Sequence, residues 1–290
     1  MRLACGPQRK LAGMTAATRN LAQRFPKRRA FITGAASGFG LACAELLARD
    51  GWNLMLTDVD APRLSIIAGR LAAQGVRVGA EACDVRDAGM VKKVVDDAAE
   101  TLGGLDLAVN SAGVAAVGPF GASEPADWQW MFDINVHGVA NCCRALLPHM
   151  LQRRGGLIVN VASAAAFCTG ANMSGYNATK AAVVALSESL QQEYGGQRIQ
   201  VVAAMPGFFR TRLMDEARGP AKVLAGAQRL MEKSGLDANE VAEYILTAAG
   251  AGRTHIVYSS YYRWIWRWKR LAPQSFQRYF PRFLARGRDS

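Results

Sequence analysis

The regular alternation of two kinds of segment is the feature of this 290-residue sequence that most constrains its fold. Short apolar runs, such as RAFIT at 29–33 and GLIVNVAS at 156–163, alternate with longer segments of helical periodicity. Further apolar runs occupy 52–58, 76–85, 105–113, 199–207 and 254–260, and the helical segments occupy 41–51, 65–75, 92–104, 128–152 and 176–195. Strands that are apolar throughout and separated by helices are typical of a parallel sheet covered on both faces. The sequence therefore predicts a single α/β domain over 28–260, with a Rossmann-type, doubly wound parallel sheet.

Positive charge is concentrated at the two ends of the chain. The net charge is +12, yet 1–29 contain eight Lys and Arg with no acid, and 261–290 contain eight with one acid. The body between them is mildly acidic and lacks the basic footprint that a nucleic-acid-binding domain needs. We therefore expect no nucleic-acid partner for the body.

Residues 1–27 are predicted to form a basic, flexible leader. The segment is free of acids and rich in Ala and Thr, and so loosely resembles a mitochondrial transit peptide. An untargeted disordered leader, or a translation start at Met14, explains the same composition equally well. The segment lacks the apolar middle of a secretory signal, and no apolar run in the chain approaches the roughly 18 residues of a membrane span.

The six cysteines indicate a reducing compartment. They form no C-x-x-C pair, and no Cys/His cluster has the spacing of a zinc site. Buried free thiols are the expected state, with no metal and a cytoplasmic location.

A glycine-rich turn follows the first predicted strand. The segment TGAASGFG at 33–40 places Gly34, Gly38 and Gly40, together with Ser37 and Phe39, between a strand and a helix. Glycine lets the backbone approach a pyrophosphate, and a helix N-terminus offers free N–H groups to it. In this context the turn predicts a dinucleotide site.

Asp58 ends the second predicted strand, about 20 residues after the glycines. A carboxylate there can accept hydrogen bonds from both ribose hydroxyls of NAD and repels the extra phosphate of NADP. Because neither Ser37 nor Val59 is basic, we expect NAD as the cofactor. The alternative is an aspartate that only caps the following turn.

Tyr176 and Lys180 form the strongest chemical signal. Four residues apart, they share one face of a predicted helix. A nearby ammonium stabilises a phenolate and lowers the pKa of tyrosine toward the range of an acid/base catalyst. Ser163 lies thirteen residues earlier, where its hydroxyl could hold a substrate oxygen beside the tyrosine.

The ordered set of motifs resembles the ordinary-length short-chain dehydrogenases/reductases over residues 28–259. To those already given it adds Asp84-Val85, Asn110-Ser111-Ala112-Gly113, Asn135 and Pro206-Gly207. Ser111 is a mild departure, because the family often has Asn at that position. The resemblance implies association into a homodimer or homotetramer through helices of the 128–152 and 176–195 kind.

The resemblance also implies roles for individual residues. Tyr176 would be the general acid/base, Ser163 would orient the substrate, and Lys180 would bind the nicotinamide ribose. Asn135 would anchor a water molecule linking Lys180 to solvent. The remaining implied cofactor contacts are Asp84 and Val85 at adenine, Asn110, Ala112 and Gly113 near the adenosine ribose, and Pro206, Gly207 and Thr211 over the nicotinamide.

An insert at 208–235 interrupts the alternation after the sixth predicted strand. Ligands of such sheets bind at the carboxyl ends of the strands, so we interpret the insert as a substrate lid, with an ordinary surface helix as the alternative. The apolar side chains predicted to surround the substrate are Phe167, Phe208, Phe209, Leu213 and Met214.

Residues 261–290 form a basic, aromatic tail that includes RWIWRWKR at 263–270. On a helical wheel, Tyr261, Trp264, Ile265, Trp268, Leu271 and Ala272 share one side, opposite Arg263, Arg267 and Arg270. Phe276, Tyr279, Phe280 and Phe283 repeat the pattern against Arg278 and Arg282. Pro273 is expected to end the first helix and Pro281 to kink or stop the second.

The segregation of aromatic and basic residues predicts that 261–285 lie on the inner face of a membrane without spanning it. Packing against a neighbouring subunit is one alternative. Stacking on single-stranded nucleic acid is another.

Together these patterns predict an NAD-dependent oxidoreductase that interconverts a hydrophobic secondary alcohol and its ketone. A lipid, retinoid or steroid-like substrate would fit a membrane-bound tail. A 3-oxoacyl-type reductase and a dinucleotide-sensing protein without turnover are the alternatives.

Overall fold

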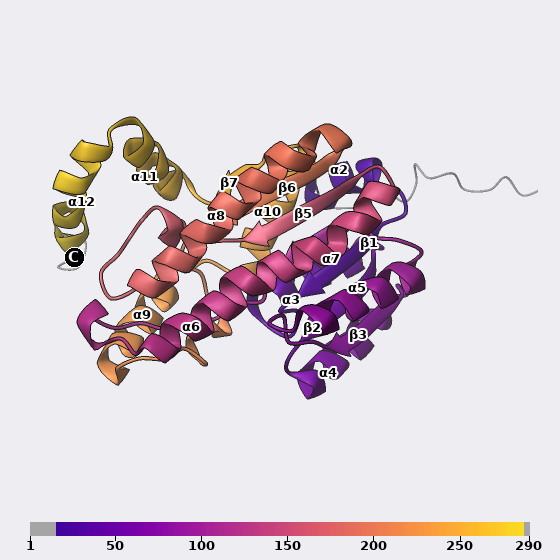
Figure 1. Ribbon diagram of the computed structural model, residues 1–290, viewed down its shortest axis with the longest axis horizontal. Helices are drawn as coiled ribbons and strands as arrows, with labels where there is room; N and C mark the ends of the chain where they lie inside the picture. Colours follow the sequence, from indigo (N-terminus) through magenta and orange to yellow (C-terminus); the bar gives the residue numbers. More distant parts are fainter. Residues whose placement is uncertain (1–15, 287–290) are drawn as a thin grey trace, which may run out of the picture.

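The computed structural model describes residues 16–286 and contains one seven-stranded sheet within them (Figure 1). The strands lie in the order β3-β2-β1-β4-β5-β6-β7, and every neighbouring pair is parallel. Their bounds are β1 Arg29–Thr33, β2 Asn53–Asp58, β3 Val78–Ala82, β4 Leu107–Asn110, β5 Gly156–Val161, β6 Ile199–Met205 and β7 His255–Val257. The predicted doubly wound parallel sheet is confirmed.

Helices cover both faces of the sheet, and successive strand residues point into two different cores. Ile32 packs beneath α3 (Gly38–Arg49), α4 (Ala61–Ala72) and α10 (Ala238–Gly250). Its neighbour Phe31 packs beneath α5 (Ala88–Leu102), α7 (Val139–Gln152) and α8 (Ser174–Tyr194). The period of two along each strand explains why these strands are apolar throughout.

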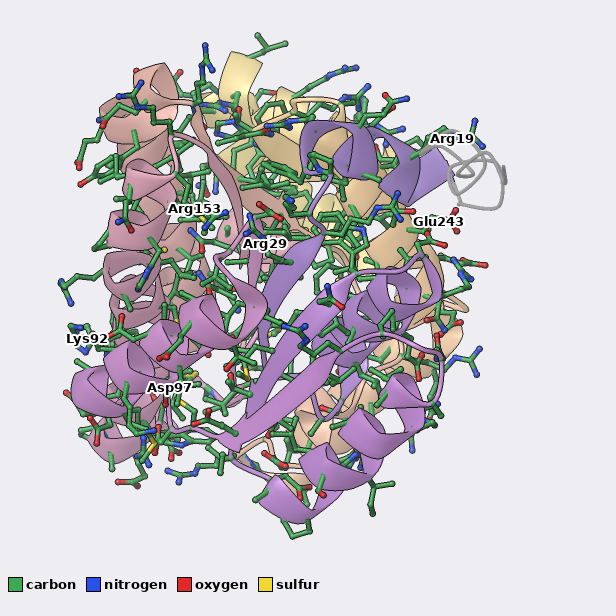
Figure 2. The ribbon with its side chains drawn as sticks, turned by 90° about the vertical axis from the view of Figure 1, so that its right-hand side faces the viewer. Arg19, Arg29, Lys92, Asp97, Arg153 and Glu243 are labelled. Carbon is green, nitrogen blue, oxygen red and sulfur yellow. The ribbon has the colours of Figure 1, made fainter. Side chains whose placement is uncertain are left out.

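Charged side chains occur both on the surface of the molecule and in its interior. Figure 2 shows Lys92 and Asp97 on the outside of α5 and Arg29 inside the molecule. Arg29 is 5% exposed and forms an ion pair with Asp106 (Nη2–Oδ1 2.5 Å). The pair joins the start of β1 to the segment before β4, at the end of the sheet opposite the pocket described below.

The predicted helical stretch over 128–152 is divided in the structure. It consists of α6 (Pro125–Phe132), a π-helical turn η2 (Asp133–Gly138) and α7. The short 3₁₀ turns are η1 Phe120–Ala122, η3 Ala164–Ala166, η4 Gly195–Gln197 and η5 Arg212–Met214. The insert at 208–235 contains η5 and helix α9 (Ala221–Lys233).

The predicted leader differs from the structure where the two overlap. Residues Ala16–Arg24 form helix α2, which packs against α10. Leu21 is fully buried in the core, and Thr18 donates a hydrogen bond to Asp50. This part of the leader is therefore a folded helix, because its few apolar residues share one face. Residues 1–15 lie outside the described residues.

The tail forms two helices at one end of the molecule, drawn in yellow in Figure 1. Helix α11 spans Ser260–Leu271 and α12 spans Pro273–Arg286, so Pro273 separates them as predicted. Pro281 does not stop the second helix, because α12 continues through it, and the predicted kink there stays a prediction. The side chains of Arg282 and Phe283 lie outside the described residues.

The apolar side of the tail is only partly as the helical wheel predicted. Ile265, Phe276 and Phe280 are at most 3% exposed and join the core around α8. Trp264 and Leu271 are 51% and 85% exposed and face away from it. The inner side of the tail thus packs on its own chain as a core segment. Among the described residues, no helix combines the length and apolarity needed to cross a membrane.

The burial of Leu21 generates a stability prediction. Leu21→Ala should lower the free energy of unfolding by about 2–5 kcal/mol, because it leaves a cavity between α2 and α10. Gln23→Ala, an exposed change on the same helix, should alter it by less than about 0.5 kcal/mol. Denaturant unfolding of both variants measures the difference, and equal stabilities would show that α2 contributes nothing to the fold.

Candidate active site

A single long pocket of about 1500 Å³ runs along the carboxyl ends of the strands. Parallel strands end at one edge of the sheet, and this edge is where ligands of open α/β sheets bind. The residues that follow β1 to β6 and line the pocket include Gly34, Asp58, Asp84, Ala112, Ser163 and Gly207. The volume exceeds the roughly 300–1,000 Å³ of an ordinary small-molecule site, so a dinucleotide and a substrate can occupy it together.

The glycine-rich turn and the start of α3 form one part of the pocket wall. Gly34 and Gly38 have φ values of +63° and +53°. Ser37 caps α3 without a side-chain hydrogen bond, which leaves first-turn N–H groups available to an anion. A Cβ on Gly40 would collide with the Gly34 carbonyl oxygen, so Gly40 serves helix–strand packing and is not on the pocket wall. Phe39 borders the pocket.

Asp58 occupies the end of β2, on the pocket wall. Its Oδ2 accepts a hydrogen bond from the Ala36 backbone N–H (2.9 Å), and its Oδ1 accepts one from Asp60 N–H (3.1 Å). These bonds orient the carboxylate beside the glycine-rich turn. It does not cap α4, because Asp60 does so by accepting from Arg63 N–H.

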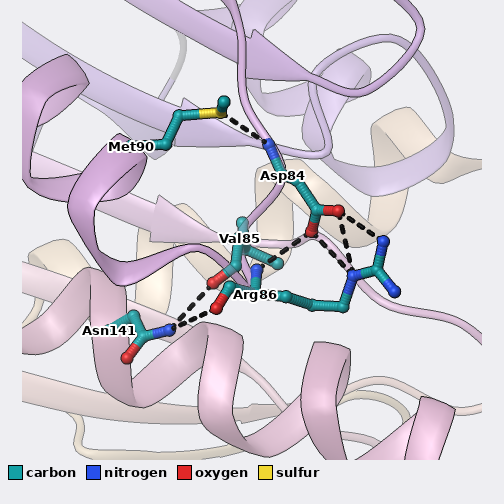
Figure 3. A network of polar contacts seen from close by, with 5 residues as sticks. All are labelled: Asp84, Val85, Arg86, Met90 and Asn141. Atoms are coloured by element: carbon teal, nitrogen blue, oxygen red, sulfur yellow. Dashed lines mark hydrogen bonds and ion pairs between the residues drawn. The ribbon is translucent and has the colours of Figure 1, made fainter.

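Asp84, Val85 and Arg86 follow β3 and form a polar network at the adenine end of the pocket (Figure 3). The Arg86 guanidinium donates to both oxygens of Asp84, and this bond lowers the pKa of the Asp84 carboxyl. Asn141 Nδ2 donates to the Val85 carbonyl oxygen (3.0 Å), which ties this loop to α7. The sequence analysis missed Arg86, although its position two residues after Asp84 was a usable signal.

Four predicted site residues do not line the pocket, namely Gly40, Asn110, Asn135 and Phe167. Asn110 is 1% exposed, and its Nδ2 donates to Asn160 Oδ1 (2.8 Å) between β4 and β5. Phe167 is 6% exposed and packs in the core beneath the tail. The side chains of Asn110 and Phe167 point into the protein because of strand register and the η3 turn.

Tyr176 and Ser163 meet in the middle of the pocket. Tyr176 lies in the first turn of α8, and Ser163 precedes η3, where its Oγ accepts from Ala165 N–H (3.1 Å). Both side chains line the pocket, and Ser163 is close enough to Tyr176 to influence its pKa. Burial raises the pKa of Tyr176 to about 12, and Ser163 opposes this rise.

Lys180 is held one helical turn below Tyr176. Its Nζ donates to the Val161 carbonyl oxygen at the end of β5 (2.9 Å) and lies 5.7 Å from the centroid of the Tyr176 ring. Burial lowers the pKa of Lys180 to about 8. Without a ligand, therefore, burial favours the uncharged form of both side chains, and the expected lowering of the tyrosine pKa is not seen in this state.

Asn135 lies in the π-helical turn and is fully buried. Its Oδ1 accepts from Val114 N–H (2.8 Å), while its Nδ2 donates to the Val114 carbonyl oxygen (2.9 Å) and to Thr179 Oγ1 (3.2 Å). Asn135 thus fastens the loop after β4 to α8 and keeps Gly113 beside Lys180. These contacts give it a positioning role, and its predicted role in a water relay stays a prediction.

Residues of the insert also line the pocket. Thr211 Oγ1 lies next to Gly38, and Phe208, Phe209, Leu213 and Met214 all line the pocket. Phe209 also reaches the core beneath α3 and α10. The predicted apolar surroundings of the substrate are therefore present, except for Phe167.

The described cysteines are all free thiols. Four are buried, and Cys168 is partly exposed on the pocket wall. Within residues 16–286, no group of three or more His, Cys, Asp or Glu side chains could hold a metal ion.

Comparison with known proteins identifies the family. The short chain dehydrogenase family model matches residues 28–221. Oxidoreductase UcpA of Escherichia coli is 38% identical over 187 residues, which are 64% of this chain and 71% of UcpA.

Two solved structures share the fold and hold different dinucleotides. A short-chain dehydrogenase/reductase from Burkholderia phymatum in complex with NAD has a TM-score of 0.74 and 35% identity, covering 79% of this chain and 88% of that one. An alcohol dehydrogenase from Thermococcus sibiricus, complexed with 5-hydroxy-NADP, has a TM-score of 0.71 and 28% identity, covering 81% and 97%. With the glycine turn, Ser163, Tyr176 and Lys180 in place, the chain belongs to the short-chain dehydrogenase/reductase family of oxidoreductases.

Proposed function

We propose that this protein interconverts a hydrophobic secondary alcohol and its ketone, with NAD as the hydride carrier. One observation carries the proposal. The side chains of Tyr176 and Ser163 lie next to each other on the wall of a pocket whose lining also includes the glycine turn, Asp58 and apolar side chains of the insert.

The residues of the pocket fit a nicotinamide dinucleotide. The N-terminus of α3 would hold the pyrophosphate, Asp58 the adenosine ribose and Lys180 the nicotinamide ribose. The bound dinucleotide would supply or accept hydride at the substrate carbon.

The chain itself handles the proton and the position of the substrate. Ser163 donates a hydrogen bond that orients the substrate oxygen. Tyr176 donates a proton to that oxygen during ketone reduction and accepts it during alcohol oxidation. Its raised pKa keeps it protonated at neutral pH before ligands bind, which is the state that reduction needs. A charged Lys180 stabilises the phenolate that reduction leaves behind.

Three other proposals concern substrate, assembly and catalysis. A 3-oxoacyl thioester would present the same ketone to Tyr176, so it belongs in any substrate screen. Members of this family are typically oligomeric, and we propose a homodimer or homotetramer here. A sensor without turnover would need no paired Tyr176 and Ser163 hydroxyls, which favours an enzyme.

Tyr176→Phe should reduce turnover by about 10²- to 10⁴-fold while NAD affinity changes little, because the hydroxyl transfers a proton but is not needed to hold the cofactor. Tyr194→Phe, at the far end of α8, is the matched control and should keep full turnover. Nicotinamide absorbance with a panel of apolar ketones, together with calorimetric NAD binding, provides the measurement. A wild-type rate in Tyr176→Phe would disprove the assignment.

NAD should bind more tightly than NADP, because the oriented Asp58 carboxylate would repel a 2′-phosphate. Asp58→Asn keeps the side-chain oxygen that Ala36 uses and removes the charge. It should shift the ratio of the two dissociation constants toward NADP by about tenfold. Asp60→Asn removes a nearby carboxylate that does not line the pocket and should leave the ratio unchanged. Tighter NADP binding by the unaltered protein would contradict this interpretation of Asp58.

We also propose that the outer side of the tail contacts an anionic membrane surface. Tyr261, Trp264 and Leu271 are about half exposed or more and lie on one side of α11. Exposed Arg267 and Arg270 lie on the same helix. An apolar stripe flanked by arginines suits a helix lying in a headgroup region.

Sedimentation with phosphatidylserine-containing vesicles tests this contact. Binding should weaken with salt but persist, because salt screens the arginines and not the apolar stripe. The double change Trp264→Ser and Leu271→Ser should remove the salt-resistant part, whereas Ile66→Ser, an equally exposed apolar change on α4, should not. Unaltered protein that stays in the supernatant at low salt would reject the proposal, and a smaller oligomer in the double variant would indicate a subunit contact instead.

A further inference from the structure

The far wall of the pocket comes from the tail. Besides residues of the sheet edge and the insert, the pocket is lined by Tyr261 and Tyr262 of α11 and by Phe280 and Pro281 of α12. All four lie beyond residue 221, where the match to the family model ends. The tail is therefore part of the site and not only an appendage to the domain.

Tyr262 joins the tail to the segment that begins the insert. Its ring lies directly on Gly207, where any Cβ would overlap ring atoms of Tyr262. Its hydroxyl is close to the backbone of Phe208, and burial raises its pKa to about 12. Position 207 must be glycine for this contact, so Gly207 and Tyr262 form a matched pair.

The turn before α11 directs Tyr262 to this place. Ser259 has a φ of +71°, which is a costly conformation for a residue with a Cβ. Its Oγ accepts a hydrogen bond from Tyr262 N–H (3.4 Å) and so caps α11. Contacts further along the chain anchor the two tail helices, and these contacts hold the strained turn in place.

Two kinds of contact anchor the tail. Lys269 Nζ donates to the Phe167 carbonyl oxygen (3.0 Å), next to η3. Phe276 and Phe280 stack on each other with ring centroids 4.3 Å apart, and the Trp268 ring packs on the edge of Phe276 at 5.2 Å. Phe280 is at once a core residue and a pocket residue, whereas Phe276 is a core residue only.

The pocket lining contains many apolar side chains besides those of the tail, together with Arg212 and Glu216 of the insert. The apolar ones include Cys168, Met173, Phe208, Met214 and Met231. Flexible methionines adapt to irregular apolar shapes, and a few polar groups at one end of an apolar pocket fix only the reacting end of a ligand.

We propose that Tyr262 and Phe280 determine specificity by forming the wall against which the apolar end of a long ketone or secondary alcohol packs. This inference rests on the proposed function. The reacting carbon lies at Tyr176, and the apolar end extends between the methionines of the insert and the tail. Short substrates reach Tyr176 without reaching the tail.

A series of 2-alkanones of increasing length tests the inference in the full chain with NADH. For the unaltered protein, kcat/KM should rise by up to about fourfold per added methylene until the chain reaches the tail, since burial of one CH₂ corresponds to about that factor. In Phe280→Leu, the ratio of kcat/KM for long over short ketones should fall by about fivefold. Phe276→Leu removes the same atoms from a residue of the same helix that is equally buried and should leave the ratio unchanged.

The outcomes separate the inference from the proposed function. If no ketone or alcohol is turned over by the unaltered protein, the proposed function fails. If ketones are reduced but the length profile is flat, or shifts equally in Phe276→Leu, the inference fails while the function stands. Should Phe280→Leu not fold, Tyr262→Phe carries the test, because it removes one oxygen and no buried carbon. It should raise KM for long ketones more than for short ones, and an unchanged profile would overturn the proposal.

Discussion

The buried ammonium of Lys180 is the constraint on which the site depends. An amine that is 5% exposed is costly to keep charged, and burial alone lowers its pKa to about 8. The structure offers one compensating acceptor, the Val161 carbonyl oxygen at the end of β5. That bond requires α8 to cross the sheet where β5 ends. The same crossing places Tyr176 beside Ser163, so one charged group fixes the register of a helix against a strand.

The neighbourhood of Lys180 extends this constraint to the loop after β4. Gly113 lies beside both Lys180 Nζ and Asn135 Oδ1, and Asn135 holds Val114 through both backbone groups. The π-helical turn places Asn135 at this point, as such turns frequently do at functional sites. Burial raises the pKa of Tyr176 and lowers that of Lys180, yet at neutral pH the tyrosine stays protonated and the amine stays mostly charged. The free protein therefore holds a proton donor beside a cation.

Much of this arrangement could be predicted from the sequence, because it depends on local patterns. The apolar runs predicted every strand, and the glycine turn, Asp58 and the Tyr176–Lys180 spacing predicted residues that do line one pocket. The failures were non-local. The Asn110 side chain faces Asn160 and not the pocket. This direction depends on the pairing of β4 with β5, which the motif does not encode. The amphipathic tail showed which residues are apolar but not which of them the protein itself would cover.

The tail shows why apolar residues that face solvent are hard to distinguish, from sequence alone, from apolar residues that line a pocket. Tyr262 and Ile265 point toward the protein, while Trp264 and Leu271, on the same helix, point away from it. Helix α11 carries apolar side chains on two sides, and each side needs its own apolar contact. The inner side completes a pocket that the sheet and the insert leave open. Tyr261 belongs to both surfaces, since it lines the pocket and is 46% exposed. The exposed apolar stripe therefore continues into the apolar part of the pocket.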